Sequence, residues 1–254
     1  MVEIIVDGKK IKATKGNYLL KELKKNGIKI PALCDHSSVE PWGGCRLCLV
    51  KITKEEWKGW GKIVASCLYP VEEGLIVYTK DSEVEEARKE VIDLMLARSP
   101  QTPLIVELAK EYGIEKTSYE EYKEPTDCIL CGLCTRICEG LGMNAISLMD
   151  RGIGREVAPP FNLEPPDCIG CLSCAYICPT NFIKFEENDK KRKIWGKEFE
   201  KLTCKNCGKG TVTKMEAEYF SKKQGIDPSV FELCDKCKRE VYSKKFEELQ
   251  KGRQ

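Results

Sequence analysis

Sixteen cysteines are the residues of this chain whose type and spacing could do chemistry. They fall into four groups of four with none left over, and groups of four thiolates are typical ligands of zinc ions and of iron–sulfur clusters. The sequence has no signal-peptide pattern and no apolar run long enough for a membrane span, so we expect a cytoplasmic protein with reduced cysteines. Metal binding is therefore favoured over disulfides. The groups are Cys34, Cys45, Cys48 and Cys67; Cys128, Cys131, Cys134 and Cys138; Cys168, Cys171, Cys174 and Cys178; and Cys204, Cys207, Cys234 and Cys237.

The second and third groups share one spacing, C-x2-C-x2-C-x3-C, at 128–138 and 168–178. In bacterial-type ferredoxins with two [4Fe–4S] clusters, three successive cysteines bind one cluster and the fourth binds the other. The spacing therefore predicts two crossed ligand sets, with a pair of zinc sites as the alternative. The first set is Cys128, Cys131, Cys134 and Cys178, and the second is Cys138, Cys168, Cys171 and Cys174.

The last group consists of two C-x2-C pairs, Cys204 with Cys207 and Cys234 with Cys237, separated by a long insert. This is the zinc-ribbon pattern, so we expect a structural Zn²⁺ on these four cysteines. A mononuclear iron or an iron–sulfur cluster is the alternative at this site. Because zinc is redox-inert, its role would be folding or docking.

The first group has one C-x2-C pair and two single cysteines, which suits a [2Fe–2S] cluster surrounded by a loop better than a zinc site. His36, the single histidine of the chain, lies two residues after Cys34. A Rieske-type site needs two histidines, so Cys67 is the expected fourth ligand and His36 is redundant. We expect His36 on the loop near the cluster, where its charge could tune the potential or face a partner.

Residues 1–80 read as a β-rich unit with one helix. A hairpin is predicted over 2–13 around Asp7 and Gly8, and further strands over 48–52, 62–66 and 75–79. A helix is predicted over 17–27, with Asn17 as N-cap and Gly27 as its stop. Residues 53–62 are expected to form a surface hairpin that lengthens the loop before Cys67. One helix on a small mixed sheet suggests the β-grasp arrangement of plant-type ferredoxins.

Residues 81–126 are predicted to form a helical connector. Ser82 and Glu85 have the spacing of a capping box, and the apolar face expected after them is Val84, Ala87, Val91 and Leu94. A second helix should start at Thr102 and Pro103. Residues 187–201 read as a basic, solvated connector, and the tail is predicted to end in a helix over 239–251.

The predicted fold class is α+β, in four units. These are a plant-type [2Fe–2S] domain over 1–80, the helical connector over 81–126, a two-[4Fe–4S] ferredoxin domain over 127–186 and a zinc-ribbon-like module over 187–254. The formal charge is +2 with thiols counted as neutral. Four filled sites at about −2 each would bring it to about −6, so the composition gives no support for nucleic-acid binding.

Several stretches resemble a known family: "CDHSSVEPWGGCRLCLV", "ASCLYPV", "EEGLIVYT", "CILCGLCTRICEG", "DRGIGREVAPPFN" and "CIGCLSCAYICPT". They are similar to the N-terminal iron–sulfur region of the large subunit of respiratory NADH dehydrogenase, and to the electron-input subunits of NAD-linked and electron-bifurcating hydrogenases. The resemblance covers about residues 1–186. That family usually carries a further [4Fe–4S] cluster on three cysteines and a histidine, but residues 98–127 contain neither residue type.

The resemblance implies a relay subunit of a multi-subunit NAD(P)-linked oxidoreductase, with electron bifurcation as one variant. The chain would pass single electrons between a flavin and NAD(P)H-binding subunit and a catalytic subunit such as a hydrogenase, or a ferredoxin. It would not be catalytic by itself, because no dinucleotide-binding glycine motif, P-loop or nucleophile context is found. The alternatives are a free-standing polyferredoxin-like carrier and a zinc-dependent interaction or nucleic-acid module.

Overall fold

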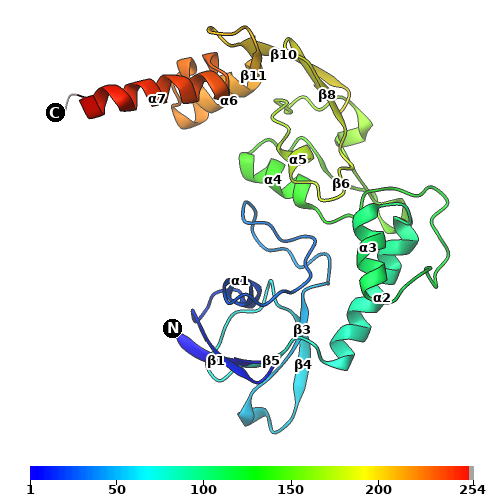
Figure 1. The fold of residues 1–254 in the computed structure, drawn as a ribbon. Coiled ribbons are helices and arrows are strands. Elements are labelled where there is room, and N and C mark those ends of the chain that lie inside the picture. The colour runs from blue at the N-terminus through cyan, green and yellow to red at the C-terminus, as the bar shows by residue number, and fades with distance from the viewer. Residues whose placement is uncertain (252–254) are drawn as a thin grey trace.

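The computed structural model describes residues 1–251, which form an open, curved chain of four structured parts (Figure 1). A sheet domain is followed by a helical pair, then by a small domain around α4 and α5, and finally by a second sheet with two helices (Figure 1). Within the described residues, no helix is long and apolar enough to cross a membrane.

The N-terminal domain is a five-stranded mixed sheet in the order β2-β1-β5-β3-β4, in which only β1 and β5 run parallel. The predicted hairpin over 2–13 is confirmed, because Asp7 (φ 48°) and Gly8 (φ 80°) form its two-residue turn. Leu19, Leu20 and Leu23 of the single helix are buried in the core. The elements are β1 (Val2–Val6), β2 (Lys9–Ala13), α1 (Leu19–Lys25), β3 (Leu49–Thr53), a 3-10 turn (Glu55–Trp57), β4 (Gly61–Ala65) and β5 (Ile76–Tyr78).

The start of α1 differs from the prediction. Its N-cap is Tyr18, and Asn17 instead donates its side-chain amide to Glu22 Oε1 at 2.9 Å. Glu22 is buried and also accepts the Thr14 backbone N–H at 3.0 Å, so its carboxylate organises the loop before the helix. The predicted N-cap Asn17 is therefore wrong, while the helix does end just before Gly27, whose φ of +76° is left-handed.

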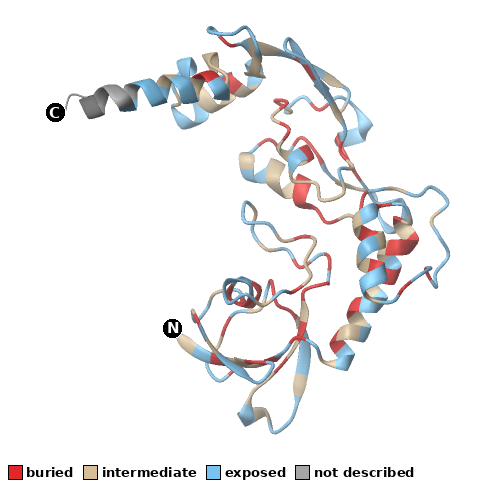
Figure 2. Ribbon diagram, viewed as in Figure 1, coloured by how far each residue is buried: buried red, intermediate tan, exposed pale blue. Residues whose placement is uncertain are grey.

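The connector contains α2 (Ser82–Arg98) and α3 (Pro103–Glu111), whose ribbons both carry segments of buried residues (red in Figure 2). The predicted apolar face of α2 is wrong at Leu94, which is 49% exposed, whereas Val84 is buried as predicted and Val91 packs against the core. Val84, Ile92 and Leu96 form the buried stripe with Arg88 between them. Arg88 can be buried because its guanidinium donates to the Leu49 carbonyl at 2.6 Å, and sequence periodicity does not anticipate a charge in that stripe. The predicted start of α3 at Thr102 and Pro103 is confirmed.

The N-cap of α2 is Asp81, whose carboxylate accepts the Glu83 N–H at 3.1 Å, so the predicted capping box of Ser82 and Glu85 is wrong. We expect Asp81→Ala to destabilise the first turn by about 1 kcal/mol, since N-cap carboxylates contribute that much. Hydrogen exchange of residues 82–86, followed by mass spectrometry, should become about fivefold faster. The matched control is Ser82→Ala, which should change little; a larger effect at Ser82 than at Asp81 would contradict the assignment.

Two short helices, α4 (Leu133–Leu141) and α5 (Ser173–Tyr176), pack against each other in the third part. An antiparallel pair, β6 (Ser147–Met149) and β7 (Glu156–Ala158), connects them together with 3-10 turns at Gly152–Gly154 and Pro160–Asn162. Cys134 and Cys138 of the first motif lie in α4 and Cys174 of the second lies in α5, so the contact of the helices brings the two motifs together.

The fourth part is an antiparallel sheet in the order β11-β10-β9-β8, followed by α6 and α7. The prediction of a solvated connector over 187–201 is wrong, because Arg192, Ile194 and Phe199 are buried there. In β9 the two lysines are exposed while Arg192 and Ile194 pack inward, an alternation that a charge count does not reveal. The elements are β8 (Phe185–Glu187), β9 (Lys191–Ile194), β10 (Lys197–Thr203), β11 (Gly210–Thr213), α6 (Lys214–Gln224), a 3-10 turn (Pro228–Glu232) and the predicted terminal helix α7 (Asp235–Lys251).

Candidate iron–sulfur and metal sites

The first four cysteines are all buried and form two hydrogen-bonded pairs. The Cys34 thiol donates to the Cys45 sulfur, which lowers the pKa of Cys45 to about 5 and raises that of Cys34. The Cys67 thiol likewise donates to Cys48, whose pKa falls to about 7. Two pairs of adjacent sulfurs are the donor set that a [2Fe–2S] cluster needs, with two thiolates for each iron.

The loop between α1 and β3 is shaped by glycines at its tip. Gly43 has φ +71°, and a Cβ there would lie 2.5 Å from Leu68 Cδ1 and 4.0 Å from Cys67 Sγ. A side chain at this position would clash with Leu68 and would be strained at this φ, so glycine suits this turn next to Cys67.

His36 lies on this loop and is exposed, where the sequence led us to expect it. Its Nδ1 accepts the Ser38 backbone N–H at 3.1 Å. This nitrogen is therefore already used within the loop, which supports a role outside the ligand set.

The two repeated motifs have the same backbone conformation. Left-handed φ angles occur two and four residues after the first cysteine of each, at Leu130 (52°) and Gly132 (66°), and at Gly170 (73°) and Leu172 (61°). Leucine rarely adopts such angles, and backbone strain of this kind is concentrated at functional sites. The turns aim backbone N–H groups at the sulfurs: the Leu130 N–H opposes the rise in the pKa of Cys128 that burial causes.

Cys178 lies with the first motif although it belongs to the second. Burial is the main cause that raises the pKa of Cys131 to about 11, and the negative charge of Cys178 contributes. The same charge acts on Cys128 and Cys134. Cys178 Sγ accepts the Phe182 N–H at 3.3 Å. The structure therefore brings Cys178 to the motif that the crossed assignment predicts.

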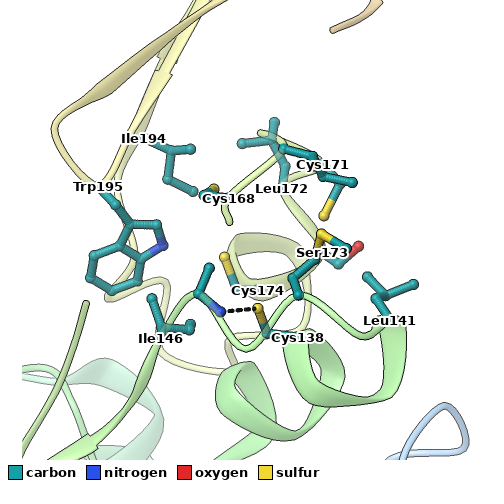
Figure 3. Close-up of a pocket in the computed structure, with 13 residues that line it drawn as sticks. Cys138, Leu141, Ile146, Cys168, Cys171, Leu172, Ser173, Cys174, Ile194 and Trp195 are labelled. Carbon is teal, nitrogen blue, oxygen red and sulfur yellow. Dashed lines mark hydrogen bonds between the residues drawn. The ribbon is translucent and has the colours of Figure 1, made fainter. Parts of the chain in front are cut away.

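The remaining cysteines of the two motifs line one pocket (Figure 3). Cys138 reaches it from α4, and its sulfur accepts the Ala145 N–H at 3.4 Å. Burial raises the pKa of Cys174 in this pocket to about 12. Most other lining side chains are apolar, so the pocket suits a buried sulfur-ligated group. Its cysteines are Cys138, Cys168, Cys171 and Cys174, the members of the second predicted set.

The last four cysteines close round a single point. The sulfurs of Cys204, Cys207, Cys234 and Cys237 all lie within 4.8 Å of one another, with Cys207 Sγ and Cys234 Sγ 3.6 Å apart. A tetrahedral zinc with Zn–S bonds of about 2.3 Å places its sulfurs about 3.8 Å apart, so the spacing fits one such ion. The Cys234 backbone N–H lowers the pKa of Cys204 to about 6, which favours the thiolate that a metal binds.

Arg136 connects the first cysteine loop to the first repeated motif. From α4 it donates to the Cys34 carbonyl at 2.6 Å and the Glu40 carbonyl at 2.5 Å. Its guanidinium also lies over the Trp42 ring, 5.5 Å from the centroid. Trp42 in turn covers Gly132, where a Cβ would lie 2.8 Å from its ring. Neither Arg136 nor Trp42 is a predicted site residue, and their isolated positions in the sequence gave no signal of this contact.

Two hydrophobic cores join the cysteine groups. The core between α2 and α3 contains Cys34 and Cys45 together with Cys131. The next core contains Cys128 and Cys134, with Cys168 and Cys174 packed against it. The first three groups are therefore connected in series through buried side chains.

The N-terminal sheet and its four buried cysteines match a known family model. The model, described as a 2Fe-2S iron-sulfur cluster binding domain, covers residues 1–82. Residues 1–82 are thus similar to this domain family. The domain boundary predicted at residue 80 lies close to the end of the match.

The chain as a whole is similar to subunits of larger oxidoreductases. It is 26% identical to the NADPH-Fe(3+) oxidoreductase subunit alpha of Geobacter sulfurreducens, over 89% of this chain and 29% of that protein. It is 29% identical to the NADH-ubiquinone oxidoreductase 75 kDa subunit of Reclinomonas americana, over 62% of this chain and 26% of that protein. The chain therefore matches less than a third of the length of these curated relatives.

A solved structure shares the fold. It is a chain of an NAD+-reducing [NiFe]-hydrogenase in the H2-reduced state, with a TM-score of 0.63 and 25% identity. The match covers 71% of this chain and 86% of that chain. The expected kinship with NADH dehydrogenase and NAD-linked hydrogenase subunits is thus confirmed.

Proposed function

We propose that this chain is the electron-transfer subunit of a multi-subunit NAD(P)-linked oxidoreductase. A flavin-containing partner that binds NAD(P)H would exchange electrons with the 2Fe-2S domain. A catalytic subunit, such as a hydrogenase, or a ferredoxin would exchange electrons with the two [4Fe–4S] clusters. The names of the similar proteins support this reading, since they are subunits of NADPH, NADH and NAD+ oxidoreductases.

One observation carries the proposal: the hydrophobic core that contains Cys34 and Cys45 also contains Cys131. A cluster on the first group and a cluster on the second would then share a buried, water-poor environment, as a relay of single electrons requires. A mobile carrier needs only one exposed cluster, so buried sites in series favour a relay built into a complex.

The proposed cofactors are one [2Fe–2S] cluster, two [4Fe–4S] clusters and one Zn²⁺. The [2Fe–2S] cluster would use the four buried cysteines of the 2Fe-2S domain, with the Cys34–Cys45 and Cys48–Cys67 pairs each holding one iron. The first [4Fe–4S] cluster would use Cys128, Cys131, Cys134 and Cys178, and the second Cys138, Cys168, Cys171 and Cys174. The zinc would use Cys204, Cys207, Cys234 and Cys237.

Metal analysis of anaerobically purified protein tests this inventory. We expect about ten iron, about ten inorganic sulfide and about one zinc per chain, from one [2Fe–2S], two [4Fe–4S] and one zinc site. An excess of iron over this count, with no zinc, would show that the last site holds iron rather than zinc. About four zinc and no sulfide would instead leave four structural zinc sites and remove the relay.

Purification of the tagged chain from its native host tests the partner. A flavoprotein that binds NAD(P)H should co-purify in stoichiometric amount, and adding NAD(P)H to that complex should reduce the clusters. Isolation of a lone chain whose clusters accept electrons from many donors would favour the free-standing polyferredoxin-like carrier. Salt-sensitive binding to nucleic acid would favour the zinc-dependent module.

A further inference from the structure

Trp195 occupies an unusual position for a tryptophan. It lies in the two-residue turn between β9 and β10 with a left-handed φ of 55°, followed by Gly196 at 78°. Its ring lines the pocket that holds the second cysteine set. The sheet that carries it is the segment expected from the sequence to be a solvated connector. A large aromatic residue in a turn is held there because its ring covers this pocket.

The indole nitrogen of Trp195 is buried and has no hydrogen-bond partner among the residues described. Leaving a buried donor without an acceptor is unfavourable, so a native protein that keeps one at this position supplies an acceptor for it. Figure 3 shows the nitrogen edge of the ring turned toward the interior of the pocket, where Cys174 points.

Three other side chains from the C-terminal sheet hold the cysteine loop against Trp195. Arg192 donates to the Gly170 carbonyl at 2.6 Å, and Thr213 donates to the Ile169 carbonyl at 2.6 Å. Lys197 donates to the carbonyls of Pro165, Pro166 and Cys168 at 2.8–3.0 Å. The loop and the tryptophan are therefore fixed to the same sheet, and the direction of the N–H relative to the loop is set by the fold.

We propose that Trp195 donates its indole N–H to a sulfur of the [4Fe–4S] cluster bound by the second cysteine set, and thereby raises the reduction potential of that cluster. This inference rests on the proposed function. One-electron reduction adds negative charge to the cluster and its thiolates, so a fixed N–H donor stabilises the reduced state more than the oxidised state. Trp195 acts on the cluster through its ligand environment and is a positioning and tuning residue.

Redox titration of the whole protein tests the proposal. Trp195→Phe keeps an aromatic ring and removes the donor. We expect the reduction equilibrium of one cluster to weaken about tenfold, which is a fall of about 59 mV for a one-electron couple. The other cubane and the [2Fe–2S] cluster should keep their potentials. The matched control is Trp60→Phe, since Trp60 lies 58% exposed on the β3–β4 hairpin of the 2Fe-2S domain.

The cluster whose potential shifts is identified with Cys138→Ser. This variant alters or removes the reduction step of the cluster bound in this pocket. Unchanged potentials in Trp195→Phe, or equal shifts of both cubanes, would overturn the proposal. If Trp195→Phe loses the cluster, pulsed electron paramagnetic resonance of wild-type protein with ¹⁵N-labelled indole decides instead. A nitrogen coupling to the reduced cluster supports the bond, and its absence overturns it. Iron and sulfide contents separate this result from failure of the proposed function, since a protein without cubanes fails that earlier test.

Discussion

Replacement of Cys67 by alanine is expected to abolish the [2Fe–2S] signal in electron paramagnetic resonance and to leave both cubane signals in place. Cys67 is buried and is the hydrogen-bonded partner of Cys48, so its loss leaves one proposed iron with a single thiolate. Cys48 and Cys67 lie in the core of the N-terminal sheet, which contains no cubane ligand, so the cubanes should be spared. Because cluster binding is coupled to folding, the 2Fe-2S domain should also unfold more easily.

Two control variants sharpen the test of Cys67. Cys67→Ser keeps an oxygen ligand and should shift the [2Fe–2S] signal rather than remove it. Leu68→Ala changes a neighbouring side chain that is 43% exposed and should leave the signal unchanged. Loss of a cubane signal in Cys67→Ala, with the [2Fe–2S] signal retained, would show that the ligand sets are wrongly assigned.

Replacement of Arg136 by methionine is expected to separate the first two clusters without removing either. Methionine keeps the length of the side chain but cannot donate to the carbonyls of Cys34 and Glu40. At about 1.5 kcal/mol for each charge-assisted bond, the docked arrangement should lose about 3 kcal/mol, or roughly a hundredfold in its population relative to the undocked one. Electron transfer from the [2Fe–2S] cluster to the first cubane should slow accordingly.

Flash reduction of the [2Fe–2S] cluster, followed by its reoxidation, measures this rate. The dipolar coupling between the two reduced clusters should weaken in Arg136→Met, while the metal content stays unchanged. The matched control is Arg151→Met, which removes an exposed arginine from the same domain. An unchanged rate and coupling in Arg136→Met would mean that the shared core alone holds the two sites together.

Local sequence patterns are sufficient to predict several structural features of this protein. The turn at Asp7 and Gly8 and the start of α3 at Pro103 both follow from residue-specific backbone preferences. Cysteine groups are visible in a sequence because the coordination of one cluster fixes several spacings at once. The ligand sets could therefore be proposed before any fold was known.

Contacts between distant segments could not be predicted in this way. Arg136 and Glu40 are far apart in the sequence, and neither has a periodic signature that points to the other. Asn17 failed as a cap because Glu22 competes for its side chain, and Arg88 interrupts an apolar stripe because Leu49 offers a carbonyl from another element. The sequence does not predict the strands within residues 185–203, because the many charged residues around Trp195 mask the alternation of buried and exposed positions.

The donors that hold the second cysteine loop all come from residues 192–213, whereas the carbonyls that accept them lie within residues 165–170. A polypeptide cut after residue 186 would retain every proposed cubane ligand and lose every one of these donors. Its loop carbonyls would have only water as a hydrogen-bond donor in place of these side chains. The pocket would also lose the wall that Ile194 and Trp195 provide. The shortest excisable piece that keeps this pocket intact therefore extends to α6, well past the last cubane cysteine.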